Sequence, residues 1–299
     1  MSAKGWGLLL LLTLLWGSSF FFYKVLVMAL PPVTAMLGRV GIAAIAMNLW
    51  LLAQGETIPL RDGLWLRFLL LGFLNNALPF VLLAWGETYI TSGMASILNA
   101  TTPIFMVAVA HWGTHDEKLS AGKVAGIAFG ILGVMVLVGQ DAFGGVSLVW
   151  GEGAVIAASC VLGIGGVYSR RFTELKPLVA ATGQITGATI ILVPLSLLID
   201  RPWALAPPSG AVWASLLTIA LVNTALAYVF YYRMLAITGA TYISLVTFLI
   251  PVMALWLGVA FLHETITVRS LAGMAIIAMG LVAMDAKRFR LPSSRRRWQ

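Results

Sequence analysis

The chain has 299 residues, of which 60% are hydrophobic and only 10% charged, and its mean hydropathy is +0.96. A soluble domain is about half apolar and about a quarter charged. This composition therefore excludes a water-soluble enzyme, a nucleic-acid-binding domain and a disordered chain. The single cysteine, Cys160, excludes an intramolecular disulfide and a cysteine zinc cluster. The sequence predicts an all-α polytopic membrane protein.

Apolar segments long enough to cross a bilayer follow one another along the chain, with short connections between them. A spanning helix takes about 20 mostly apolar residues, and ten segments meet that requirement. The first follows Lys4 and is longer than the apolar stretch of a signal peptide, so we interpret it as a span. The predicted spans are Gly5–Leu30, Pro32–Ala53, Trp65–Thr88, Thr91–Trp112, Ala121–Val138, Leu148–Ser169, Pro177–Ile199, Ala211–Tyr232, Ala240–Leu262 and Val268–Met284.

The basic residues are distributed unevenly between the two sides of the membrane. With ten spans both termini lie on one side, and 15 of the 19 Lys and Arg residues fall there. The opposite loops hold only Arg201 and Arg269. The positive-inside rule therefore predicts cytoplasmic termini. The basic tail, residues 287–299, directly follows the last span, where anionic lipid head groups are the expected partner rather than nucleic acid.

The two halves of the sequence resemble each other at a nearly constant spacing. The matching blocks are residues 30–40 with 175–185, 74–78 with 222–226, and 117–120 with 264–267, at offsets of 145, 148 and 147. Each half holds five spans, and an odd number makes the second half enter the membrane in the opposite orientation. We expect residues 1–145 and 146–286 to form two inverted five-helix repeats, the architecture of alternating access.

Several motifs in these repeats are typical of one transporter family. They are Trp16-Gly17-Ser18-Ser19 in the first span, Pro103 and Pro251 in the fourth and ninth, and the acidic turns that begin at Glu117 and Glu264. Over essentially the whole chain the pattern resembles the EamA family of the drug/metabolite transporter superfamily. It is most similar to the bacterial amino-acid exporters of that family, including those for aromatic amino acids. The resemblance implies an inner-membrane exporter that is not an enzyme, needs no cofactor and functions as a monomer.

Polar side chains at mid-depth predict where a substrate binds, because polar groups inside a bilayer are costly. At 1.5 Å per residue, the asparagines of the third, fourth and eighth spans lie about 12–18 Å into the membrane. They predict a central polar cavity that suits a small zwitterion better than a large cation. The alternative interpretation is that these side chains form hydrogen bonds between helices and do not contact the substrate. The candidate substrate-binding residues are Asn75, Asn76, Asn99, Asn223, Thr101, Thr102, Ser244, Thr247, Trp16, Tyr228 and Arg39.

Prolines and charges inside the spans form a second group of candidates. Pro79, Pro103 and Pro251 each free a carbonyl one turn earlier and are the candidate hinge or gate residues.

Arg39 either binds a substrate carboxylate or has a structural or gating role, and it corresponds to Gln184 in the second half. Lys24 is expected to snorkel to the outer surface. Glu87 is interpreted as a solvated loop residue, with a proton carrier as the alternative.

Other function classes find little support in the residues. His111 and His115 have helical spacing, but the topology puts His263 on the other side of the membrane, so no metal site is expected. There is no Walker loop for ATP hydrolysis. Three alternatives stay open: a proton-coupled multidrug or cation efflux pump that relies on Glu87, a membrane-embedded enzyme, and a sensor or scaffold that does not transport.

Overall fold

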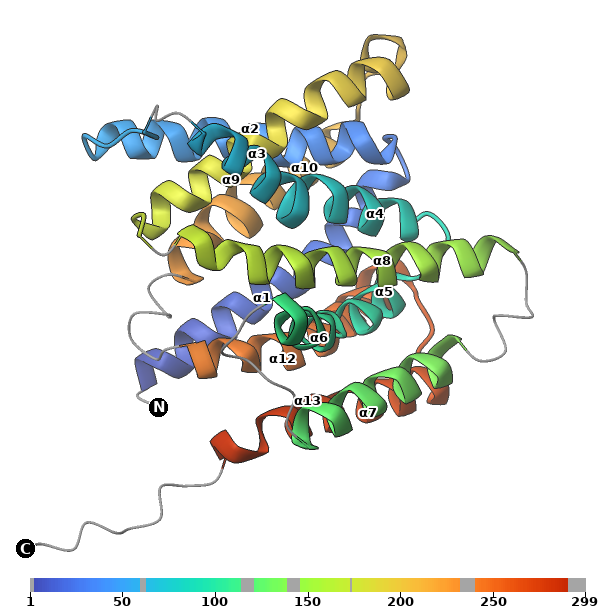
Figure 1. Cartoon of the computed structure of the whole chain (residues 1–299). Coiled ribbons are helices and arrows are strands. Elements are labelled where there is room, and N and C mark those ends of the chain that lie inside the picture. Colours follow the sequence, from blue (N-terminus) through green and yellow to red (C-terminus); the bar gives the residue numbers. More distant parts are fainter. Residues whose placement is uncertain are drawn as a thin grey trace, which may run out of the picture.

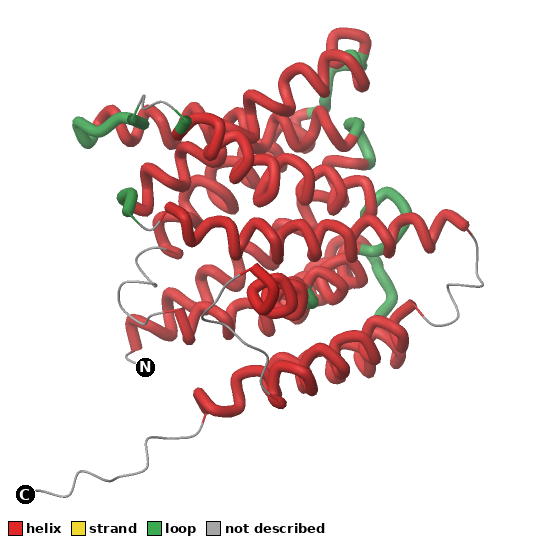
Figure 2. The backbone as a smooth tube through the Cα atoms, in the orientation of Figure 1, coloured by secondary structure: helices red, strands yellow, loops and turns green. Residues whose placement is uncertain are grey.

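The structure is a computed structural model that describes residues 3–59, 63–113, 121–138, 146–172, 174–231 and 240–289. Within these ranges every regular element is a helix (Figure 2). The helices lie side by side and run across the molecule in alternating directions (Figure 1). Seven helical segments of 20 to 25 residues are long and apolar enough to span a membrane, and three shorter apolar helices accompany them. The predicted ten-helix polytopic membrane fold is confirmed.

The helices begin and end close to the predicted boundaries. In chain order they are α1 (Ala3–Val27), α2 (Pro32–Ala53), α3 (Leu64–Gly72), α4 (Leu78–Gly86), α5 (Ser92–Asn99), α6 (Thr102–Gly113), α7 (Ala121–Val138), α8 (Val146–Tyr168), α9 (Pro177–Leu195), α10 (Gly210–Leu217), α12 (Ala240–Leu262) and α13 (Val268–Phe289). Pro32 and Pro177 occupy the first position of their helices, where a missing N–H costs nothing. Thr91 caps α5 with its hydroxyl, which accepts a hydrogen bond from the Met94 backbone N–H at 3.2 Å.

Three predicted spans are interrupted in the middle of the membrane. A π-helical segment, Phe73–Ala77, separates α3 from α4, and a second one, Thr218–Leu226, continues α10. These two segments correspond at the offset of 148 found in the sequence. The fourth span breaks at residues 100–101, between α5 and α6. A π turn replaces the i to i−4 backbone hydrogen bonds with i to i−5 bonds and so changes the direction of the side chains that follow it. Such turns are frequent at functional sites.

The two sides of the molecule can be told apart by the chain ends. We call the side that carries the start of α1 and the end of α13 the terminal face, at the left of Figure 1, and the other side the opposite face. The turns of the opposite face are residues 28–31, 87–91, 201–209 and 263–267.

Close backbone contact sets the spacing of α3 and α9. A Cβ atom at Gly72 would lie 2.4 Å from the Gln184 carbonyl oxygen, and one at Gly187 would lie 2.5 Å from the Phe68 carbonyl oxygen. Glycine at both positions therefore lets the two helices pack backbone to backbone. This contact brings the polar side chain of Gln184 beside the first π-helical segment.

The last helices of the two halves, α7 and α13, pack against each other along one edge of the molecule (Figure 1). A Cβ at Gly133 would lie 3.0 Å from the Gly273 carbonyl oxygen, and a Cβ at Gly280 would lie 2.8 Å from the Gly126 carbonyl oxygen. Glycine at these positions therefore allows the two helices to pack closely.

Candidate functional site

A cavity of about 420 Å³ lies between the two halves of the chain. Its volume is in the range of pockets that hold small organic molecules. The wall is built from α1, α2, α4, α5, α6, α8, α9 and α12, together with both π-helical segments and residues 169, 228 and 231. Asparagine, threonine and aromatic side chains share it with one arginine.

The cavity opens toward the terminal face and is closed toward the opposite face. Ser169 and Tyr231 line it near the terminal ends of their helices, and both are partly exposed. Tyr23, Arg39 and Leu83 line it nearest the opposite face, and all three are buried. A solute reaches this cavity from the side of the chain termini.

Arg39 forms the closed end of the cavity and contacts both halves of the chain. Its Nε donates a hydrogen bond to the Thr224 hydroxyl at 2.9 Å, and a terminal guanidinium nitrogen donates to the Tyr23 hydroxyl. The guanidinium carbon lies 4.0 Å from the centroid of the Phe80 ring. The planar cation is therefore held by two hydrogen bonds and a cation–π contact. It places a fixed positive charge beside the cavity.

Gln184 occupies the corresponding position in the second half and makes a matching set of contacts. Asn75 Nδ2 donates to Gln184 Oε1 at 3.2 Å, and Gln184 Nε2 donates to the Tyr228 hydroxyl at 2.9 Å. Tyr228 lies 148 residues after Phe80, which is the offset of the repeat. The chain of amide and hydroxyl groups is neutral, so the cavity is polar on this side and charged on the other.

Asn99 and Thr102 line the cavity on either side of the break between α5 and α6. The Thr102 hydroxyl donates to the Asn99 carbonyl oxygen at 2.8 Å, and the Ser159 hydroxyl donates to Asn99 Oδ1 at 3.4 Å. The Trp16 and Tyr231 rings lie 5.6 Å apart between centroids and form an aromatic wall. These predicted residues share one cavity with Arg39, Asn75 and Tyr228.

Asn223 reaches the cavity wall, but its amide is used to hold helices together. Its Nδ2 donates to the Leu15 carbonyl oxygen at 2.6 Å and to the Ser18 hydroxyl at 2.9 Å. The side chain is 1% exposed. Asn223 therefore fixes α1 against the second π-helical segment, which is the interhelical role considered as the alternative.

Two expected cavity residues do not line it. Asn76 is fully buried and is not part of the cavity wall, although its side chain interacts with Tyr228, which lines the cavity. Thr101 is buried as well, with its hydroxyl donating to the Leu98 carbonyl oxygen at 2.6 Å. Ser244 and Thr247 belong to α12, and their side chains lie outside the described residues.

The three prolines occupy different kinds of place. Pro79 is the second residue of α4, directly after the first π-helical segment, and Pro103 is the second residue of α6 and lines the cavity. Pro251 lies inside α12. Position 227, which corresponds to Pro79, holds Ala227, so the second π-helical segment forms without a proline.

Several residues of the cavity wall were not predicted from the sequence, among them Tyr23, Phe80, Gln184 and Thr224. Gln184 and Thr224 correspond to Arg39 and Asn76 in the first half. The repeat offsets could therefore have identified Gln184 and Thr224, since each corresponds to a candidate residue of the first half. Tyr23 and Phe80 sit in uniformly apolar stretches and carry no comparable signal.

Lys24 and Glu87 differ from their predicted surroundings. The Lys24 ammonium donates to the backbone carbonyl oxygens of Glu87 at 2.6 Å and Ile90 at 2.9 Å, so it does not snorkel. The Glu87 side chain is fully buried, so the interpretation as a solvated loop residue is wrong. The packing of α1 against the 87–91 turn covers both groups.

Two carboxylates connect the second half to helix starts of the first half on the opposite face. Glu264 accepts hydrogen bonds from the backbone N–H groups of Ser92 at 2.7 Å and Gly93 at 3.1 Å, and from the Ser92 hydroxyl at 3.0 Å. Asp200 accepts from the Thr34 backbone N–H at 2.7 Å and its hydroxyl at 2.8 Å. Negative charge at a helix start is favourable, so these contacts hold the opposite face together.

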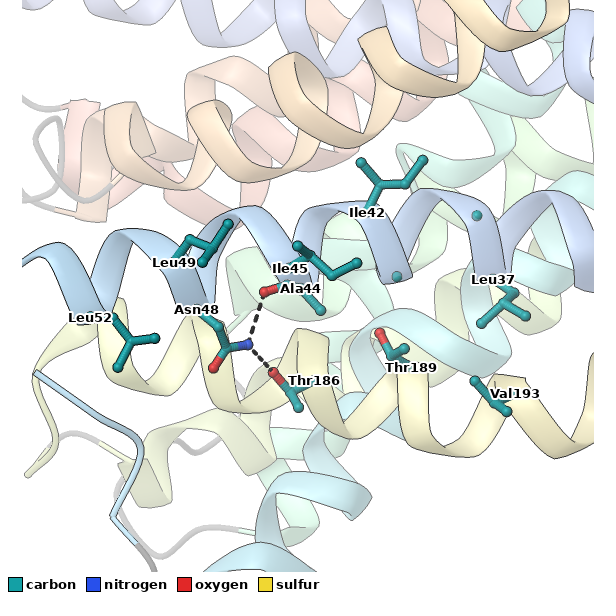
Figure 3. Close-up of a pocket in the computed structure, with 12 residues that line it drawn as sticks. Leu37, Ile42, Ala44, Ile45, Asn48, Leu49, Leu52, Thr186, Thr189 and Val193 are labelled. Atoms are coloured by element: carbon teal, nitrogen blue, oxygen red, sulfur yellow. Dashed lines mark hydrogen bonds between the residues drawn. The ribbon is translucent and has the colours of Figure 1, made fainter.

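A second hollow of about 630 Å³ lies on the surface between α2 and α9 (Figure 3). Asn48 Nδ2 crosses it to donate to the Thr186 hydroxyl at 2.9 Å. Ile45, Leu49 and Leu52 line it and are more than half exposed. An apolar lining on the outside of a membrane helix pair contacts lipid, so this groove is not the polar site.

Known proteins place the chain in a family. The sequence pattern of the EamA-like transporter family matches residues 3–139 and again residues 149–284. The chain belongs to the EamA-like transporter family. It is a membrane transporter and not an enzyme.

Individual relatives agree with this membership. The chain is 26% identical to the uncharacterized transporter YoaV of Bacillus subtilis, covering 90% of this chain and 92% of the relative. It is 25% identical to the uncharacterized inner membrane transporter YedA of Escherichia coli, with 96% and 92% covered. It is 26% identical to a probable amino-acid metabolite efflux pump of Salmonella typhimurium, with 94% of each covered. A crystal structure of 17% sequence identity superposes with a TM-score of 0.69 over 96% of this chain and 99% of the other, which shows the shared fold.

Proposed function

We propose that this EamA-family protein exports amino acids or related small metabolites from the cytoplasm, by alternating access around the cavity. The observation that carries the proposal is Arg39, the one cation among the described residues of the cavity wall. The Arg39 guanidinium complements a carboxylate in a bidentate geometry. The amide and hydroxyl oxygens of Asn75, Asn99 and Thr102 complement an ammonium group. The aromatic pair of Trp16 and Tyr231 supports an apolar or aromatic side chain.

A cation efflux pump fits the cavity less well. Among the described residues that line the cavity there is no Asp or Glu. A positively charged substrate would meet Arg39 without an acidic partner, which is unfavourable in a low-dielectric site. The zwitterion is therefore the better match.

The charge distribution supports the orientation. By the predicted topology 15 of the 19 basic residues belong to the side of the chain termini, which favours a cytoplasmic position of both termini in the bacterial inner membrane. In that orientation the cavity opens to the cytoplasm, where an exporter collects its substrate. The Salmonella relative is named as a probable efflux pump for amino-acid metabolites, in line with this direction.

The described residues of the cavity wall come from both repeats of one chain, and we include function as a monomer in the proposal. The corresponding positions of Arg39 and Gln184 in the two inverted repeats, residues 1–145 and 146–286, support alternating access. We extend the proposal to anionic lipid at the basic tail, of which residues 290–299 lie outside the described part of the chain.

Uptake into liposomes that contain the purified protein tests the function. A radiolabelled panel of amino acids, one polyamine and one lipophilic cation is offered with and without a pH gradient. We expect saturable flux of amino acids that Asn75→Ala and Asn99→Ala together abolish. The matched control is Asn48→Ala, which also removes an interhelical asparagine but lies in the lipid-facing groove. Flux of the lipophilic cation alone would overturn the proposal.

A further inference from the structure

Glu87, at the end of the third span, has a carboxyl group that is buried inside the protein. The side chain has no exposed surface, and neither carboxylate oxygen has a hydrogen-bond partner in the described structure. An ionised carboxylate that is buried without a partner costs many kcal/mol, and such a group takes up a proton instead. The closed opposite face therefore accommodates the neutral acid and excludes the anion.

The neighbouring charges are committed to other groups. Lys24 of α1 donates to two backbone carbonyl oxygens, one of them that of Glu87 itself. Glu264, from the turn between α12 and α13, is a second negative charge whose field reaches Glu87. It accepts its hydrogen bonds from the start of α5. The Lys24 ammonium favours an ionised Glu87 and the Glu264 charge disfavours it, and burial of the carboxyl without a hydrogen-bond partner outweighs both.

Other titratable groups surround the same region. Tyr23 of α1 interacts electrostatically with Glu87, and its hydroxyl accepts from Arg39 of α2. Glu152 of α8 is also buried. Its neighbour Gly151 lets α8 pack closely against the end of α4. Within the described structure none of these groups donates a hydrogen bond to the Glu87 carboxyl oxygens.

We propose that Glu87 is a proton-binding site whose occupancy is linked to closure of the opposite face. In the closed state the carboxyl is protonated. Opening that face separates the 87–91 turn from α1 and admits water, and the acid then loses its proton to that water. This proposal goes beyond the proposed function, because it does not depend on which substrate is transported. Closing the opposite face therefore takes up one proton from the solution on that side.

The linkage has a definite sign. Acid on the opposite side favours the closed state, because the closed state binds one more proton. One proton changes the ratio of closed to open states by up to about tenfold per pH unit. Glu87→Gln resembles the protonated acid, so this variant stays closed at every pH.

Infrared spectroscopy detects the proton directly. The purified full chain in lipid nanodiscs is expected to show the C=O stretching band of a protonated carboxylic acid at neutral pH, and Glu87→Gln removes part of that band. The control is Glu56→Gln, which removes a carboxylate paired with Lys176 at 2.7 Å on the terminal face and leaves the band unchanged. A band of equal size in Glu87→Gln and wild type overturns the proposal.

Thiol labelling measures the linked opening. Leu83→Cys is placed in a Cys160→Ser background, because Leu83 lines the closed end of the cavity. A membrane-impermeant thiol reagent is applied from the opposite side at several pH values. We expect labelling to rise with pH by more than it does in the same reporter carrying Glu87→Gln, which has an identical thiol. Equal pH dependence in the two proteins overturns the proposal. Neither readout needs a substrate, so failure here is distinct from failure of the export assay.

Discussion

Arg39 and Gln184 stand at corresponding positions of the two halves, and each binds a π-helical segment of the other half. Arg39 donates to Thr224 in the second segment, and Gln184 accepts from Asn75 in the first. The geometry is paired but the charge is not, because only one member is a cation. The two ends of the cavity therefore differ in charge, although their backbones are arranged in the same way.

Replacing Arg39 with lysine keeps the charge but loses the planar fork that contacts Thr224, Tyr23 and Phe80. Hydrogen bonds to charged groups contribute about 1.5–3 kcal/mol each. We therefore expect Arg39→Lys to weaken apparent substrate affinity about 10- to 100-fold. Saturation curves of uptake into liposomes give the value.

The amide derivative of the same amino acid shows whether Arg39 binds the carboxylate. We expect Arg39→Lys to reduce uptake of the acid and to leave the weak uptake of the amide nearly unchanged. An equal loss for both compounds would mean that Arg39 acts only through packing. Arg201→Lys, an exposed arginine in the 201–209 turn, serves as the control.

Asn223 and Asn75 are expected to respond differently to alanine substitution. The Asn223 amide holds α1 through Leu15 and Ser18, so Asn223→Ala is expected to lower the free energy of unfolding by about 1–3 kcal/mol. Asn75→Ala is expected to reduce transport with a smaller effect on stability. Denaturation and uptake are measured on the same preparations. Equal stability loss in both variants would contradict this division.

Gly187 is a sensitive packing position between α3 and α9. A Cβ there would lie 2.5 Å from the Phe68 carbonyl oxygen, which is backbone and does not move aside. Gly187→Ala is expected to destabilise the protein by about 1–3 kcal/mol, measured as a lower melting temperature. Gly153→Ala, on an exposed part of α8 with no atom within 4 Å of the new Cβ, is the control and is expected to be neutral or stabilising.

Glu264 caps the start of α5 from the other half of the chain. Glu264→Gln replaces one acceptor oxygen with an amide nitrogen that faces the N–H groups of Ser92 and Gly93. Loss of such a cap costs about 1–2 kcal/mol, so the first turn of α5 is expected to exchange its amide hydrogens about 5- to 30-fold faster. Hydrogen exchange followed by mass spectrometry on residues 87–99 gives the rate. Unchanged exchange there would show that the contact is not stabilising.

The spans could be predicted from the sequence, since apolar length determines them locally. The number of helices followed from segments of about 20 apolar residues. Pro32 and Pro177 marked the starts of α2 and α9, whereas the fourth span was predicted to be continuous over Thr91–Trp112 and breaks at residues 100–101. Of the residues that line the cavity, Asn75, Asn99 and Asn223 were predicted from their depth in the membrane. Arg39, Thr102, Trp16 and Tyr228 were predicted as polar or aromatic residues of the same spans or their neighbours.

What the sequence did not reveal depends on contacts between distant segments. The π-helical segments turn Asn75 toward the cavity and leave Asn76 buried, and nothing in the residue types distinguishes these neighbours. Lys24 and Glu87 sit near the end of a span, where solvent is the usual surrounding. The burial of Glu87 and the contacts of the partly exposed Lys24 follow from the packing of α1 on the 87–91 turn, which apolar periodicity does not encode.

The contact between α7 and α13 has one more consequence. Gly126 and Gly133 of one half match Gly273 and Gly280 of the other at an offset of 147, and Gly133 meets Gly273 while Gly126 meets Gly280. The same patch therefore appears on both sides of the contact, as in an isologous interface with a twofold axis in the membrane plane. A five-helix half made on its own would carry a surface complementary to its own copy. Two such chains inserted in opposite directions would reproduce this edge of the molecule as an antiparallel homodimer.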